Sequence, residues 1–150
     1  MQNEKWDQRF MDVAKLIGTW SKDRSRGIGC VIVSSERDIL ATGYNGLPRG
    51  VDDTVEERFE RPGKYIWTEH AERNAIYAAA KYGTALQDLC TIYTPLFPCM
   101  DCARAIIQSG IVRMVTYRPD FQDPQWGASF RVVLEMLQEV DFMITYLDPA

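Results

Sequence analysis

Four side chains in this sequence could together hold a metal ion and use it. His70 is the only histidine among the 150 residues, and Glu72 follows it by two positions. Cys99 and Cys102 are three residues apart and come directly after Pro98. One imidazole and two thiolates supply three ligands of a tetrahedral zinc ion, and a catalytic zinc site keeps its fourth position for water. A carboxylate beside that water could take its proton and later pass it to a leaving group.

Each of the two segments alone is a weak signal. A lone histidine is more often a core or surface residue, and a Cys-x-x-Cys pair also occurs in redox proteins and in structural zinc sites. A structural zinc site takes four protein ligands, but the other two cysteines, Cys30 and Cys90, lie in or beside apolar strands where a core role is expected. A redox pair would leave His70 and Glu72 unexplained. The combination therefore favours a catalytic zinc site.

The hydrophobic pattern predicts which elements carry these segments. Strands are expected at 30–33, 39–44, 91–94, 114–117 and 142–147, and helices at 5–19, at 71–82, after Pro98 and around 130–137. Strands joined through helices are normally parallel, whereas the short link between the first two strands predicts an antiparallel hairpin. We therefore expect an α/β fold, a three-layer α/β/α sandwich around a mixed sheet of about five strands. The ligands converge if the two helix starts meet at one sheet edge.

Length and charge limit the classes of function. The chain has the size of a single domain, residues 1–150, and 17 Lys and Arg against 21 Asp and Glu give a net charge of −4. This acidic balance argues against a nucleic acid polymer as partner, but a small phosphorylated substrate needs only a local group of cations. The sequence shows neither a signal peptide nor an apolar run of the ~20 residues that span a membrane, so a cytoplasmic location is expected.

Residues 45–67 break the periodicity of the chain. They contain three glycines, two prolines and a dense mixture of charges. Irregular stretches of this length are uncommon in small domains and are usually functional or mobile. We therefore expect this segment to be a functional insertion.

Several motifs resemble one known family. They are Ser21-Lys22-Asp23 ahead of a Val-Ile-Val strand, Gly43-Tyr44-Asn45-Gly46-Leu47-Pro48-Arg49-Gly50, His70-Ala71-Glu72-Arg73-Asn74-Ala75-Ile76 and Pro98-Cys99-Met100-Asp101-Cys102-Ala103. The pairing of His-x-Glu with Pro-Cys-x-x-Cys is the signature of zinc-dependent nucleobase deaminases. In this order, over about residues 6–117, the motifs resemble the cytidine deaminase superfamily, and within it the deoxycytidylate (dCMP) deaminases.

The resemblance implies a cytidine deaminase-like fold and a reaction. The reaction is the zinc-dependent hydrolysis of dCMP to dUMP with release of ammonia, which feeds dTMP synthesis. Zn²⁺ would be held by His70, Cys99 and Cys102, and Glu72 would carry the protons. Asn45 matches the position that binds the sugar hydroxyl, and Ala71 lies in the same substrate site.

The 5′-phosphate and the base need further partners. Cations near the predicted strand ends are candidates for the phosphate, and aromatic side chains are candidates for packing against the base. The phosphate candidates are Lys22, Arg26 and Arg118, with Arg24 as a substitute, and the base candidates are Tyr65, Trp67 and Tyr117. Solvated surface charge and core packing remain the alternative interpretations of these residues.

The resemblance also implies regulation and assembly. Gly46, Arg49 and Gly50 match a glycine-rich segment that helps to bind dCTP as activator, with Mg²⁺ accompanying it and dTTP as inhibitor. Residues 45–67 contain no cysteine or histidine, so a second zinc is not expected there. A homo-oligomer, most simply a hexamer, is expected.

Two other functions remain open at this point. One is a zinc deaminase acting on cytidine, cytosine, guanine or a tRNA adenosine. The other is a noncatalytic zinc- or nucleotide-binding module. Glu72 distinguishes the second, because a purely structural metal site does not need this carboxylate.

Overall fold

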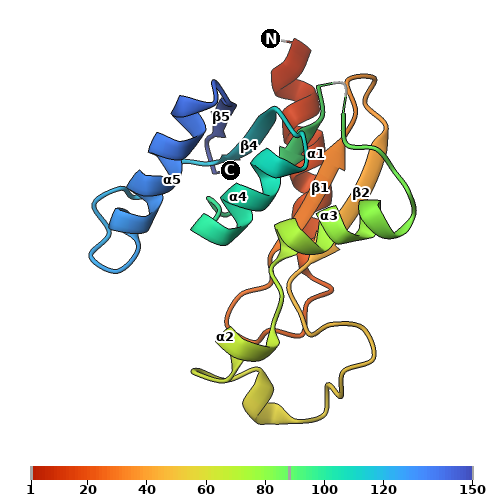
Figure 1. Cartoon of the computed structure of the whole chain (residues 1–150), viewed down its shortest axis with the longest axis vertical. Coiled ribbons are helices and arrows are strands. Elements are labelled where there is room, and N and C mark those ends of the chain that lie inside the picture. Colours follow the sequence, from red (N-terminus) through yellow and green to blue (C-terminus); the bar gives the residue numbers. More distant parts are fainter. Residues whose placement is uncertain (1, 88, 150) are drawn as a thin grey trace.

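The computed structural model describes residues 2–87 and 89–149 (Figure 1). The regular elements follow one another in the predicted order. They are α1 (Gln2–Gly18), β1 (Gly29–Val33), β2 (Ile39–Tyr44), the short η1 (Glu56–Arg58) and α2 (Lys64–Trp67), α3 (Ala71–Lys81), β3 (Thr91–Tyr93), α4 (Met100–Gln108), β4 (Arg113–Tyr117), α5 (Gly127–Glu139) and β5 (Met143–Leu147).

The five strands form one mixed sheet in the order β2-β1-β3-β4-β5, which confirms the predicted fold class. β1 pairs antiparallel with β2, as the short link between them predicts, and it also pairs antiparallel with β3. β3, β4 and β5 are parallel neighbours, because a helix connects each to the next. β1 thus separates two strands, β2 and β3, that run in the same direction.

Helices cover both faces of the sheet. In β1, Cys30 and Ile32 join the core beneath α3, α4 and α5, whereas Val31 and Val33 join the core beneath α1. This alternation follows from the two-residue period of a strand and produces the predicted three layers. Cys90 lies fully buried in the first of these cores, like Cys30.

A glycine allows α3 to lie directly on β2. A Cβ atom on Gly43 would come within 2.4 Å of the carbonyl oxygen of Ala71 and of the backbone nitrogen of Ala75. Only a residue without a side chain permits this approach. Gly43 therefore helps to set the position of the first turn of α3, which carries the chemistry predicted from the sequence.

Residues 45–67 are more ordered than predicted. They project from one end of the sheet (Figure 1), but they include η1 and α2 rather than lacking regular structure. An isolated β-bridge joins Gly46, at the start of this segment, to Glu69, just beyond its end. Both ends therefore lie beside the start of α3. Among the described residues, no helix is long and apolar enough to cross a membrane.

A buried polar cluster fixes α1 to the sheet. Asp7 is 2% exposed and accepts a hydrogen bond of 3.0 Å from Nη1 of Arg113 on β4. The hydroxyl of Tyr93 on β3 donates to the same carboxylate at 2.8 Å. Burial, together with this hydrogen bond to Asp7, raises the pKa of Tyr93, so the phenol stays a donor.

We expect Asp7→Ala to destabilise the protein strongly. Removing one partner of a buried ion pair leaves the other charge uncompensated and typically costs about 3–5 kcal/mol. Chemical denaturation measures this loss, and Asp12→Ala, an exposed position on the same helix, is the matched control. Equal stability of the two variants would contradict the structural role of the Asp7 cluster.

Candidate active site

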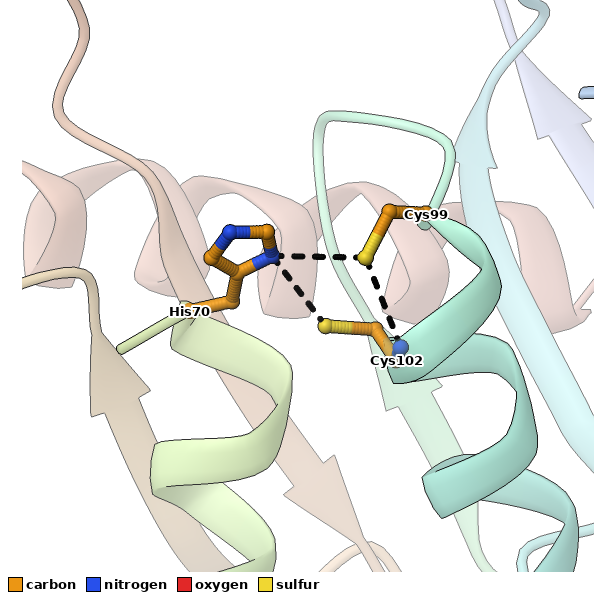
Figure 2. A group of neighbouring side chains, drawn as sticks. All are labelled: His70, Cys99 and Cys102. Carbon is orange, nitrogen blue, oxygen red and sulfur yellow. Dashed lines mark hydrogen bonds between the residues drawn. The ribbon is translucent and has the colours of Figure 1, made fainter. Parts of the chain in front are cut away.

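The three predicted metal ligands lie together at the starts of two helices. Nδ1 of His70 is 3.4 Å from Sγ of Cys99 and 3.4 Å from Sγ of Cys102 (Figure 2). A tetrahedral zinc with bonds of about 2.1 Å to nitrogen and 2.3 Å to sulfur separates such atoms by about 3.6 Å. The three ligand atoms lie within 4.8 Å of one another, so the donor set and its spacing fit zinc.

The local sequence builds both helix starts. His70 and Cys99 are the N-cap residues of α3 and α4, and both have extended backbones. Sγ of Cys99 accepts a hydrogen bond from the backbone nitrogen of Cys102 at 3.4 Å. The backbone nitrogen of His70 donates to Oε1 of Glu69 at 2.9 Å. The side-chain cap of α4 therefore holds the Cys99 thiol at the helix start, and the Glu69 carboxylate holds the backbone at His70.

The thiol environment favours a thiolate at Cys99. A hydrogen bond from Cys102, assisted by His70, lowers the pKa of Cys99 to about 4. The same hydrogen bond with Cys99 and the burial of the group raise the pKa of Cys102, and the hydrogen bond to Cys99 raises the pKa of His70. A thiolate at a helix start is the form that binds a metal.

Glu72 lies in the first turn of α3, beside the ligands. It is 4% exposed, and its Oε1 accepts a hydrogen bond of 2.8 Å from the hydroxyl of Thr94, just after β3. A buried carboxylate beside a metal site is suited to proton transfer. The sequence patterns did not single out Thr94, because a threonine in an apolar strand looks like a core residue.

A hollow of about 350 Å³ opens over these groups. Nucleotide-sized ligands occupy pockets of roughly 300–1,000 Å³. Its walls include four further residues that the sequence proposed for substrate, Arg26, Asn45, Tyr65 and Ala71. They also include residues that the sequence patterns missed, among them Arg61, Lys64, Phe97, Trp126 and Phe130.

Asn45 shapes one wall of this hollow. Its Oδ1 accepts a hydrogen bond from the backbone nitrogen of Ile28 at 2.8 Å, and its Nδ2 donates to the carbonyl oxygen of Arg26 at 2.9 Å. The hydroxyl of Ser21 donates to the carbonyl oxygen of Asn45 at 2.7 Å. Asn45 thus holds the 21–28 connection in place besides facing the hollow.

A buried ion pair supports the same connection. Lys64 of α2 donates to Oδ2 of Asp23 at 3.3 Å, and both side chains are largely buried. Oδ1 of Asp23 accepts hydrogen bonds from the backbone nitrogens of Ser25 at 2.8 Å and Arg26 at 3.1 Å. Burial raises the pKa of Asp23, but these amide bonds and Lys64 outweigh it and lower the pKa. The pair spans 41 positions of sequence, so no local pattern indicates it.

Comparison with known proteins identifies the family. Residues 4–118 match the model of the cytidine and deoxycytidylate deaminase zinc-binding region. The chain belongs to this deaminase family. It is 39% identical over 148 residues to an uncharacterized deaminase of Aliivibrio fischeri, covering 95% of this chain and 94% of that protein. It is 36% identical over 139 residues to the human deoxycytidylate deaminase, covering 88% of this chain and 75% of the human one.

Solved structures share the fold of this family member. The dCMP deaminase of the cyanophage S-TIM5, solved in complex with dCMP and dUMP, superposes with a TM-score of 0.75. The match covers 95% of this chain and 97% of the phage chain at 23% identity. At that identity the comparison supports the cytidine deaminase-like architecture, and the site assignment depends on the residues described above.

Two cations proposed for the phosphate lie outside the main hollow of this deaminase. Lys22 pairs with Asp53 and lines a second hollow instead. The guanidinium of Arg118 stacks over the ring of Tyr146, at 4.2 Å from its centroid. The substitute, Arg24, is exposed and pairs with Glu56 at 2.9 Å. Spacing along the sequence therefore did not predict which cations share the hollow with Arg26.

The three aromatic residues proposed for packing against the base also lie in different places. Tyr65 lines the main hollow, whereas the ring of Trp67 packs beneath Arg58. Tyr117 joins the core under α1, on the opposite face of the sheet from α3 and α4. Strand alternation explains this last difference, because Thr116 and Tyr117 must point to opposite faces.

The second hollow, of about 180 Å³, lies at the 45–53 segment. Gly46, Arg49 and Gly50, which the resemblance links to a nucleotide effector, all line it. Asn45 lines both hollows, so they adjoin the same residue.

We expect Cys102→Ala to abolish stable zinc binding, because it leaves two protein ligands in place of three. The purified wild-type protein should contain about one zinc per chain, and the variant less than about a tenth of that, as measured by inductively coupled plasma mass spectrometry. Cys90→Ala is the control, since Cys90 is equally buried but lies in the core. Full zinc content in Cys102→Ala would overturn the ligand assignment.

Proposed function

We propose that this protein is a zinc-dependent deaminase that hydrolyses dCMP to dUMP and ammonia. The observation that carries the proposal is the position of Glu72, buried beside three zinc-type ligands in a hollow that also has cationic side chains. A noncatalytic metal site would not need that carboxylate. A nucleoside or free base would not need those cations. The sequence relatives named deoxycytidylate deaminases support the same substrate.

Proton transfer by Glu72 is the central step of the proposed mechanism. Zinc, when bound, lowers the pKa of a water molecule that it holds. Glu72 accepts a proton from the attacking water and delivers it to N3 of the cytosine ring, while the water oxygen forms a bond to C4. Glu72 then takes the remaining proton of that oxygen and gives it to the amino group, which leaves as ammonia. The C4–N bond breaks and the carbonyl of dUMP remains.

Arg26 and Arg61 are the phosphate-binding residues in this proposal. Both are exposed and line the same hollow as Glu72. Lys64 lines it too, but Asp23 already balances its charge. Arginine suits a phosphate because its planar fork donates two hydrogen bonds at once. Lys22 and Arg118 are not included, because neither lines this hollow.

Asn45 and Ala71 keep their proposed substrate contacts. Both line the main hollow, and the Asn45 side chain retains one donor hydrogen beyond its bond to Arg26. That hydrogen could reach a sugar hydroxyl. Tyr65 and Trp126 offer aromatic surface in the same hollow for the base.

We further propose that the second hollow, of about 180 Å³, receives the phosphates of a nucleoside triphosphate effector rather than the whole molecule. Arg49 and the backbone of Gly46 and Gly50 would face these phosphates, with Mg²⁺ accompanying dCTP. The dCMP assay repeated with dCTP and with dTTP tests this, since an unchanged hyperbolic rate curve would refute regulation.

A homohexamer, a cytoplasmic location and a supply of dUMP for dTMP synthesis remain predictions. The highly exposed side chains of Ile66 and Tyr82 are consistent with an assembly.

We expect Glu72→Gln to keep its zinc and lose turnover. General acid–base catalysis typically speeds a reaction by about 10²–10⁴-fold, so kcat for ammonia release from dCMP should fall by at least about 10²-fold. The substrates to compare are dCMP, CMP, deoxycytidine, cytosine and guanine. Glu139→Gln, an exposed position on α5, is the control. Normal turnover of dCMP by Glu72→Gln would refute the mechanism.

We expect Arg26→Gln and Arg61→Gln to impair dCMP selectively. Losing a charge-assisted hydrogen bond of about 1.5–3 kcal/mol should raise KM for dCMP by roughly 10–100-fold. The rate with deoxycytidine, which lacks the phosphate, should not change. Arg9→Gln on α1, across the sheet, serves as the charge-matched control. A selective loss in Arg118→Gln instead would place the phosphate elsewhere.

A further inference from the structure

Thr94 is a buried polar residue next to the site that no sequence motif indicated. Thr94 is fully buried and directly follows β3. Its backbone nitrogen donates to the carbonyl oxygen of Val115 at 3.1 Å, so the sheet fixes its backbone. The hydroxyl therefore projects from a rigid point into the space below Glu72.

The Thr94 hydroxyl has one proton and two acceptors within reach. Oε1 of Glu72 lies 2.8 Å away, and the carbonyl oxygen of Leu96 lies 3.3 Å away. The shorter contact, to a group that can carry a full charge, is the stronger one. An ionised carboxylate can only accept, so the hydroxyl donates to Glu72.

Cys102, which also lies near the Glu72 carboxylate, cannot donate a hydrogen bond to it when zinc is bound. The thiol of Cys102 is the other group near the Glu72 carboxylate. A cysteine that binds zinc does so as a thiolate and has no proton to donate. With Cys102 bound to the metal, Thr94 is the side chain among the described residues that still donates a hydrogen bond to the Glu72 carboxylate.

We propose that Thr94 is a positioning residue for Glu72. Its hydroxyl holds Oε1 and leaves Oε2 as the oxygen that exchanges protons with water and substrate. A glutamate side chain has three rotatable bonds, and α3 fixes only its backbone. One hydrogen bond from a rigid strand end restricts the remaining rotation. The inference rests on the proposed function only in taking Glu72 as the group that moves protons.

A neighbouring threonine provides a matched control. Thr116 on β4 is also fully buried, but its hydroxyl donates a long hydrogen bond of 3.5 Å to the carbonyl oxygen of Tyr117, and among the described residues it has no bond to Glu72. Replacing either threonine with valine keeps the shape and removes a buried hydroxyl. If hydroxyl loss in this core affects activity only through general stability, both variants should behave alike.

The test compares Thr94→Val, Thr94→Ser and Thr116→Val as full-length, zinc-loaded proteins. We expect Thr94→Val to lower kcat by about 10–100-fold, the effect of a small misplacement of a catalytic group, while KM and zinc content stay unchanged. Thr94→Ser, which keeps the hydroxyl, should recover kcat to within a few-fold of the wild type. Thr116→Val should match the wild type. Equal kcat in Thr94→Val and wild type, or equal losses in Thr94→Val and Thr94→Ser, would overturn the proposal.

Crystal structures of the zinc-loaded variants provide a readout that does not depend on turnover. The Glu72 carboxylate should move or become disordered in Thr94→Val and keep its wild-type position in Thr94→Ser. An unmoved carboxylate in Thr94→Val would overturn the positioning role. If the wild-type protein released no ammonia from any cytosine substrate, the proposed function would fail, and these structures would still decide the role of Thr94.

Discussion

The metal site depends on two helices that begin at the same edge of the sheet. β2 and β3 both pair antiparallel with β1, so they run in the same direction, and the chain leaves both at one edge. His70 caps α3, which comes after β2 and the 45–67 segment, and Cys99 caps α4, the helix that follows β3. The pairing of β1 between these strands therefore brings together ligands that are 29 positions apart in sequence. A zinc ion bound by all three would join α3 to α4 directly.

Hydrogen bonds and an ion pair within the protein hold the walls of the main hollow in place. Asn45 and Asp23 bind backbone groups of the 21–28 connection, and Lys64 of α2 balances Asp23. A buried ion pair stabilises little by itself, because desolvation offsets the attraction between the charges. Its value here is geometric, since it ties the 45–67 segment to the wall that carries Arg26. The segment that breaks the sequence periodicity thus completes the site.

The two faces of the sheet use buried polar groups differently. Under α1, Asp7, Arg113 and Tyr93 satisfy one another and hold a helix against the strands. Under α3, Thr94 donates a hydrogen bond to Glu72, and the Glu72 side chain also lines the main hollow. Alternation along β3 separates the two clusters, because Tyr93 and Thr94 point to opposite faces.

The sequence alone determined the parts of this protein that depend on local pattern. Residue type and short spacing indicated His70, Cys99, Cys102 and Glu72, and periodicity predicted the order of the main helices and strands and the mixed sheet. The sequence pattern did not predict the short helices in 45–67, because the glycines, prolines and mixed charges there show no helical periodicity. Only the tertiary structure decided which cations share the hollow, replacing Lys22 and Arg118 by Arg61 and Lys64 beside Arg26. Side-chain direction and contacts across 22 or 41 positions, as in Thr94–Glu72 and Lys64–Asp23, depend on how elements pack, and no local pattern records that packing.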